Sequence, residues 1–231
     1  MRFLKRRAKI ERTVYASIDE IAENLDLEIP YYPEVYWTGR SLDFYSLGLP
    51  IYLKKEFDIR KIRRKSYFLS SPGIIFIGKE SLTDQVEEAA HFLHATLSKI
   101  NYKRKSIEDC VSIWILDEML AYLSSKFVIP ERINPYGRYK DYTRMKEKGR
   151  KDFLFQISRY FYQDFDLLDF NIYQQGYGLG ETIFCEYCSG RFSLEEMRKL
   201  FLQNFEGNNE ASSTFIRLKC RFGNLNSHLS N

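Results

Sequence analysis

The chain has 231 residues, of which 44% are hydrophobic and 29% are charged. This balance is typical of a globular protein and excludes an intrinsically disordered one. No apolar run approaches the roughly 20 residues that cross a bilayer, and the basic start lacks the apolar stretch of a signal peptide. Four cysteines without a dense framework are typical of a reducing compartment. We therefore expect a cytoplasmic protein with no membrane partner.

The net charge is only +4, but the basic residues gather in three clusters. Such clusters can follow the phosphate backbone of a nucleic acid, and they can equally line solvated loops and helix faces. Because each cluster contains or adjoins acidic residues, the sequence favours the solvated interpretation and keeps nucleic-acid binding as the alternative function. The clusters are Lys5, Arg6, Arg7, Lys9 and Arg12; Lys54, Lys55, Arg60, Lys61, Arg63, Arg64 and Lys65; and Arg138, Lys140, Arg144, Lys146, Lys148, Arg150 and Lys151.

The first expected elements are a short helix and three strands. Ser17-Ile-Asp-Glu20 has the form of a capping box and predicts a helix from Ser17 to about Leu25. Pro30 and Pro33 then break the chain. Segments rich in Val, Ile, Tyr and Phe predict strands at 34–38, 50–53 and 73–78.

Helices follow in the second part of the chain. Hydrophobic periodicity predicts them at 79–98 and 106–127, and again near 151–162, 173–187 and 194–205. Residues 206–231 include Gly207-Asn-Asn and a Ser- and Asn-rich end, and they are predicted to form a loose tail. Strands first and helices later favour an α+β fold, with one domain covering 1–205.

The helix at 79–98 carries Glu87-Glu88-Ala-Ala-His91, one residue away from the zinc-binding pattern H-E-x-x-H. Glu87, His91 and His94 form one stripe, spaced four and then three residues apart, and Glu88 lies about 60° round from His91. A zinc-peptidase helix needs two ligands one turn apart and a carboxylate turned toward the bound water. The alternative is a surface histidine pair with neighbouring acids on an amphipathic helix.

The following helix places Glu118 on an apolar face that includes Val111, Ile115 and Tyr122. Burying an unpaired carboxylate is costly or forces it to take up a proton, so Glu118 needs a partner. A metal ion or a histidine is the expected partner. An ion pair with Arg or Lys, or exposure to solvent, is the alternative.

Residues 33–125 resemble the gluzincin group of zinc metallopeptidases. The resemblance rests on a strand, a following helix with x-E-x-x-H and a second helix with Glu118-Met-Leu-Ala121. In that group the pattern is H-E-x-x-H followed by E-x-x-A. The resemblance implies a zincin-like fold, with a small mixed sheet followed by mostly helices. It also implies His91 and Glu118 as metal ligands and Glu88 as general base. Glu87 occupies the position of the first ligand, and His94 is the candidate substitute for it.

Glu87 makes the motif degenerate and the metal site altered. The resemblance implies Zn²⁺, whereas a site richer in oxygen ligands would favour Mn²⁺ or Fe²⁺. A less positive zinc site acidifies its water less, so hydrolysis should slow. We expect either a peptide-bond hydrolase of reduced or changed metal dependence, or a non-catalytic peptidase homologue with a vestigial site and no metal. The expected partner is a peptide or protein segment in extended form, held along the strand at 73–78.

The segment at 173–187 resembles the closing helix of small gluzincin-like proteins more loosely. If it folds over the site, Tyr173 or Tyr177 could stabilise an oxyanion. The alternative is that both tyrosines only pack, as most of the 17 tyrosines in the chain are expected to do. Gly176 and Gly180 are predicted to permit close helix packing rather than to bind a dinucleotide. The pair Cys185 and Cys188 is predicted to be two packed thiols, because zinc usually needs four ligands.

Overall fold

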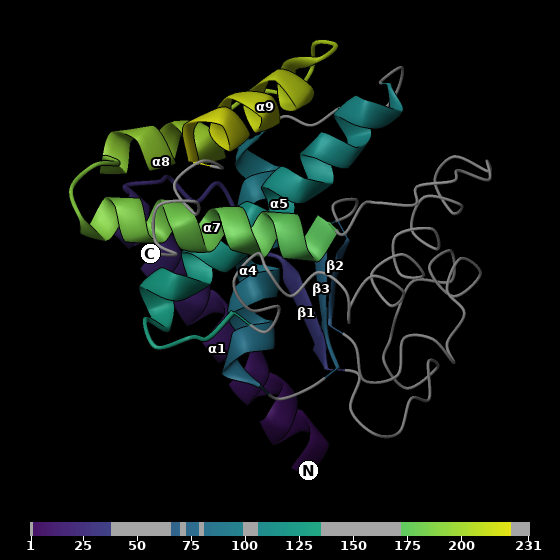
Figure 1. Ribbon diagram of the computed structural model, residues 1–231. Coiled ribbons are helices and arrows are strands. Elements are labelled where there is room, and N and C mark those ends of the chain that lie inside the picture. The colour runs from purple at the N-terminus through teal and green to yellow at the C-terminus, as the bar shows by residue number, and fades with distance from the viewer. Residues whose placement is uncertain are drawn as a thin grey trace.

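The computed structural model describes residues 2–37, 66–69, 73–78, 81–98, 106–134 and 172–222. Helices predominate in these ranges and accompany one small sheet (Figure 1). The coarse α+β class is thus confirmed, while the zincin-like arrangement stays a prediction. The helices are α1 (Arg2–Leu25), α4 (Leu82–Leu97), α5 (Ile107–Val128), α7 (Ile172–Cys188), α8 (Leu194–Phe201) and α9 (Glu210–Phe222). The strands are β1 (Glu34–Trp37), β2 (Tyr67–Leu69) and β3 (Ile74–Ile77).

β3 is the central strand of the sheet, which has the order β1-β3-β2. It runs parallel to β1 and antiparallel to β2, with Ile75 in register with both Val35 and Phe68. All four residues of β3 are buried, as expected for a strand covered on both faces. The predicted strands at 34–38 and 73–78 are confirmed. The one predicted at 50–53 lies outside the described residues, and β2 was not predicted.

The position of β3 corrects one expectation about partners. An extended peptide adds to a sheet through the unpaired backbone groups of an outer strand. β3 is paired on both sides, so the prediction that the segment at 73–78 offers a docking edge is wrong.

Serine caps begin both motif helices. The Ser81 hydroxyl accepts a hydrogen bond from the backbone N–H of Asp84 (3.0 Å), and Ser106 accepts one from Asp109 (3.1 Å). Each bond satisfies one of the N–H groups that the first turn leaves without a helical partner. The predicted helices at 79–98, 106–127, 173–187 and 194–205 correspond to α4, α5, α7 and α8, although α8 ends at Phe201. The helix predicted near 151–162 lies outside the described residues.

α1 is longer than the capping-box pattern predicted. It begins at Arg2, and Ser17 lies inside it, where its hydroxyl donates to the backbone carbonyl of Thr13 (2.8 Å). A serine within a helix often makes this bond to the preceding turn instead of capping. A continuous buried stripe at helical spacing explains why the helix extends on both sides of Ser17. The stripe consists of Ile10, Val14, Ile18, Ile21 and Leu25.

The segment predicted to be a loose tail contains α9, so that prediction is wrong for residues 210–222. The Asp109 carboxylate on α5 accepts a hydrogen bond from the backbone N–H of Ser212 (3.0 Å), in the first turn of α9. Apolar spacing at three and four residues then buries one face of the helix against the core. The buried residues are Ala211, Thr214, Phe215, Leu218 and Phe222.

α5 packs against α1, α4, α7 and α9, and α7 crosses it in Figure 1. Two glycines allow the close approach of α7. A Cβ on Gly176 would lie 2.7 Å from the Cβ of Glu118, and one on Gly180 would lie 2.8 Å from the carbonyl oxygen of Met119. The predicted packing role of these glycines is therefore confirmed. Within the described ranges, none of the helices has the length and apolarity to span a bilayer.

Candidate functional site

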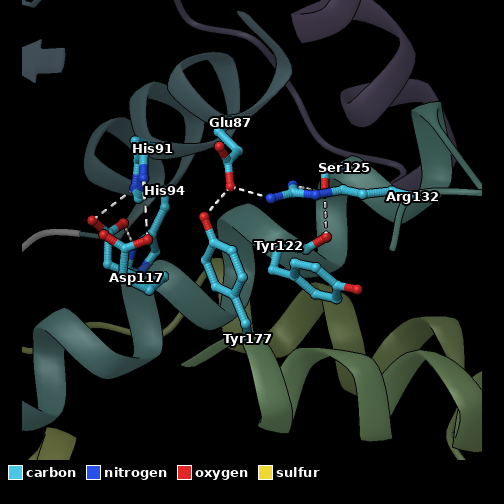
Figure 2. A network of polar contacts seen from close by, with 9 residues as sticks. Glu87, His91, His94, Asp117, Tyr122, Ser125, Arg132 and Tyr177 are labelled. Carbon is cyan, nitrogen blue, oxygen red and sulfur yellow. Dashed lines mark hydrogen bonds and ion pairs between the residues drawn. The ribbon is translucent and has the colours of Figure 1, made fainter. Parts of the chain in front are cut away.

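The predicted site residues gather where α4, α5 and α7 meet (Figure 2). α4 contributes the two glutamates and two histidines of the motif, α5 contributes Asp117 and Glu118, and α7 contributes Tyr177. Figure 2 shows two polar networks in this region. One joins Glu87 to Arg132 and Tyr177, and the other joins both histidines to Asp117.

Asp117 binds both histidines of the motif, a role that the sequence analysis missed. Its Oδ2 lies 2.9 Å from Nδ1 of His91, and its Oδ1 lies 2.6 Å from Nδ1 of His94. Burial opposes ionisation, but the charge of His91 and the two hydrogen bonds hold the pKa of Asp117 well below its ordinary value. Asp117 is therefore an anion that fixes the orientation of both rings.

The other ring nitrogen of His91 faces Glu118, with 3.8 Å between Nε2 and Oε2. The sequence placed these two residues together correctly, while their roles as metal ligands stay a prediction. Burial raises the pKa of Glu118 to about 8, with Asp117 and Glu87 adding to the effect and His91 opposing it. Although burial opposes it, the charge of Asp117 and its hydrogen bond raise the pKa of His91 well above its ordinary value. At pH 7, Glu118 is therefore mainly protonated, and the ion pair with Asp117 favours the cationic form of His91.

Glu88, the predicted general base, is buried, with 8% of its surface exposed. Burial raises the pKa of its carboxyl well above the ordinary value, and Glu87 and Glu118 raise it further, against an opposing effect of His91. A general base must be ionised to accept a proton from water. The buried environment of Glu88 therefore disfavours the ionised form that a general base needs.

Glu87 is bound by two donors. The Arg132 guanidinium and the Tyr177 hydroxyl both donate to its Oε1. Arg132 also donates to the hydroxyl of Ser125 and stacks over the rings of Tyr122 and Tyr177, at 4.6 and 5.1 Å from their centroids. Its side chain is only 5% exposed. The negative charge of Glu87 is therefore neutralised inside the protein by a fixed guanidinium.

The chain segment that carries Arg132 is itself held in place. The ammonium of Lys126 donates to the backbone carbonyl of Arg132 (2.8 Å) and lies 3.6 Å from Glu181. Tyr122 donates its hydroxyl to the same Glu181. Sequence reasoning missed Arg132 because it lies outside the helices and 45 residues from Glu87, so no helical spacing relates the two.

His94 and Tyr173 lie apart from the Glu87 network. The His94 ring is fully buried and packs edge-on against Phe201 and Phe205, with 6.3 Å between centroids in each case. Its Nε2 has no hydrogen-bond partner among the described residues. Tyr173 packs edge-on against the Tyr177 ring at 6.3 Å. Tyr177 itself points at a carboxylate, where a second negative charge such as an oxyanion would be repelled.

The four predicted ligands do not converge on one point. His91 and Glu118 face each other, whereas Glu87 is bound to Arg132 and His94 to Asp117. Across the ranges that the structure describes, no group of three His, Cys, Asp or Glu side chains is arranged to hold a metal ion. The side chains as placed do not fit the three-ligand set of a catalytic zinc site.

The pair Cys185 and Cys188 corrects a smaller prediction. Both thiols are free and exposed at the end of α7, so they are not packed in the core.

Comparison of the chain with models of protein families, with curated proteins and with solved structures gives no match. The function must therefore be inferred from the residues and the geometry of the site.

Proposed function

We propose that this chain is a non-catalytic relative of gluzincin metallopeptidases, which binds peptide or protein segments in extended form without hydrolysing them. The observation that carries the proposal is the Arg132 guanidinium on Glu87, the residue at the position of the first metal ligand. A guanidinium supplies positive charge and hydrogen bonds, but it has no open coordination position at which water could be acidified. It can therefore replace the charge of a metal ion and not its chemistry.

The charges of the cluster balance without a divalent cation. Arg132 neutralises Glu87, and the cationic His91 neutralises Asp117. Glu118 mainly holds a proton at pH 7, and burial favours the protonated form of Glu88 as well. A metal ion would have to displace the protons of His91 and Glu118, because metal ligands bind in their deprotonated forms. This arrangement supports the vestigial form of the site over the hydrolase of changed metal dependence.

The proposed partner keeps its extended form, although the place of binding shifts from the central strand. β1 and β2 are the outer strands of the sheet as described, and β1 is the longer of the two. A strand that adds to a sheet gains main-chain hydrogen bonds whatever its sequence. Such a site would serve a protein that binds segments of varied sequence.

The test is metal binding by the protein without an affinity tag, after equilibration with Zn²⁺, Mn²⁺ or Fe²⁺ and removal of free ions. Mass spectrometry should find no stoichiometric metal in the wild-type chain. The double variant Glu87→His/Arg132→Met restores the missing imidazole and removes the competing cation, so it should bind one Zn²⁺ per chain. The matched control Glu87→Gln/Arg132→Met removes the same ion pair without adding a ligand, and it should bind none.

A second assay tests the activity with denatured protein substrates. The wild-type chain should retain peptides on a column at their original masses, and its cleavage rate should not exceed that of Glu88→Gln. Two results together would establish the hydrolase alternative. The wild-type chain would bind one metal ion, which both His91→Ala and Glu118→Ala lose. It would also cleave peptides, and Glu88→Gln would abolish this cleavage. Failure to retain any peptide would refute the binding function.

A further inference from the structure

The solvent-facing side of α1 is divided by charge. Between Lys5 and Arg12 the helix carries five basic residues and one acid, Glu11. From 13 to 25 it carries three acids and no Lys or Arg. We call the first segment the basic half of α1. Its basic residues are Lys5, Arg6, Arg7, Lys9 and Arg12, and the acids of the second half are Asp19, Glu20 and Glu23.

This division opposes the electrostatics of the helix itself. The N-terminus of a helix carries a partial positive charge and the C-terminus a partial negative one, so each misplaced charge near an end costs about 0.3–1 kcal/mol. α1 has no acid in its first turn and no base in its last turn. Like charges four residues apart, such as Lys5 and Lys9, cost about 0.2–0.5 kcal/mol more. The electrostatics of the helix alone therefore does not explain the charge pattern of α1.

Lys5, Lys9 and Arg12 form a single exposed stripe, because spacings of four and three residues place side chains on one face of a helix. The stripe lies opposite the buried residues Ile10 and Val14. At 1.5 Å per residue, it extends over about 10 Å. One strand of a duplex carries a phosphate about every 3.4 Å along its axis, so three cations over that length match about three phosphates.

Aromatic side chains border the basic half. The Arg6 guanidinium lies over the ring of Trp37, 5.5 Å from its centroid, and Arg7 lies over Tyr36 at 4.7 Å. These contacts join the basic half of α1 to β1, which packs beside it. In Figure 1 the N-terminal end of α1 lies at the periphery of the molecule, far from α8 and α9. Arg6 and Arg7 are thus held against the rings of β1, of which Tyr36 is only 7% exposed.

We propose that the basic half of α1 binds the phosphate backbone of a nucleic acid. The nearest competing ligand is an anionic membrane surface, which a basic amphipathic helix binds by inserting its apolar face. That face is not available in α1, because Ile10, Val14 and Ile18 are 3%, 0% and 0% exposed within the core. The exposed side offers charge alone, which suits a polyanion in water. This inference stands independently of the peptidase-like centre.

The experiment measures binding of the full chain to fluorescent single-stranded and duplex oligonucleotides over a series of salt concentrations. The triple variant Lys5→Gln/Lys9→Gln/Arg12→Gln should bind on the order of 100-fold more weakly at 0.1 M salt. The slope of log affinity against log salt should fall by about 2.7 for duplex and about 2.1 for single strands. The wild-type affinities for the two oligonucleotides, compared at the same salt concentration, identify which form of nucleic acid the surface prefers.

The matched control is Lys199→Gln/Arg217→Gln/Lys219→Gln, which removes the same charge from exposed residues of α8 and α9. This control should keep wild-type affinity for the oligonucleotides. The α1 variant should melt at the same or a higher temperature than the wild type, because repulsion between neighbouring basic residues is relieved. Equal weakening by both triple variants would overturn the proposal in favour of general attraction by net charge. No salt-dependent binding, or binding to vesicles of anionic phospholipid and not to oligonucleotides, would also overturn it.

Discussion

Glu118 makes the stability of this chain depend on pH in an unusual direction. The pKa of its carboxyl is raised from 4.5 to about 8 in the folded chain, chiefly by burial. Between these values the folded chain keeps a proton that the unfolded chain has released. Stability must therefore fall as pH rises through this window, since the folded state binds more protons. His91, whose pKa is also raised, adds to the same trend because its charge is lost as pH rises.

The size of the Glu118 effect follows from the two pKa values. Their difference, about 8 minus 4.5, corresponds to roughly 5 kcal/mol at 1.36 kcal/mol for each factor of ten. Glu118→Gln keeps the shape of the side chain and cannot ionise. The variant should match the wild-type free energy of unfolding at pH 5 and exceed it at pH 9, by up to about 5 kcal/mol. The remaining pH dependence then reports His91 and Glu88, whose pKa values are also raised.

The assay is urea unfolding followed by circular dichroism at each pH from 5 to 9. Glu196→Gln is the control, because hydrogen bonds from Ser193 and Arg221 lower the pKa of Glu196 to about 2. Glu196 stabilises the folded chain above pH 4.5, and this contribution to the free energy of unfolding is lost only as pH falls toward 2. Glu196→Gln should therefore leave the difference in that free energy between pH 5 and pH 9 unchanged. If Glu118→Gln also leaves that difference unchanged, Glu118 does not titrate in a buried site and the reasoning is refuted.

Two further variants test the packing and the charge network. Gly176→Ala places a methyl 2.7 Å from the Cβ of Glu118 and 2.9 Å from a backbone oxygen, and we expect it to lose about 1–3 kcal/mol in urea unfolding. A variant as stable as the wild type would mean that α5 and α7 lie further apart. Arg132→Met leaves the partly buried Glu87 without its cation and should lose up to about 3 kcal/mol. Arg132→Met/Glu87→Met should recover most of this loss, and additive losses would contradict the pairing.

Local sequence patterns predicted the elements that depend on local physics. α4 and α5 follow serines that cap them, and the spacing of apolar residues in α4 indicated which of its faces is buried. The same periodicity placed Glu118 inside and beside His91. α9 could have been found in this way, because Phe215, Leu218 and Phe222 share one face. The polar composition of its surroundings was given more weight than that spacing.

The parts that were missed depend on tertiary contacts or on context. Ser17 and Glu20 have the spacing of a capping box, but the helix had already begun, so the same residues lie in its interior. Arg132 reaches Glu87 only because α4, α5 and α7 fold together around it. A one-dimensional pattern carries no information about that meeting. The altered motif was visible in the sequence, whereas the cation that compensates for it was not.

The Arg132 network also has a consequence for folding kinetics. Glu87 lies 45 residues from Arg132 and 90 residues from Tyr177 along the chain, so the network closes only after three distant segments have docked. We expect this network to form after the transition state for folding, in which case it slows unfolding more than it speeds folding. Stopped-flow measurements should accordingly find faster unfolding and an unchanged folding rate in Arg132→Met. The ion pair between Arg132 and Glu87 is thus expected to prolong the lifetime of the folded chain.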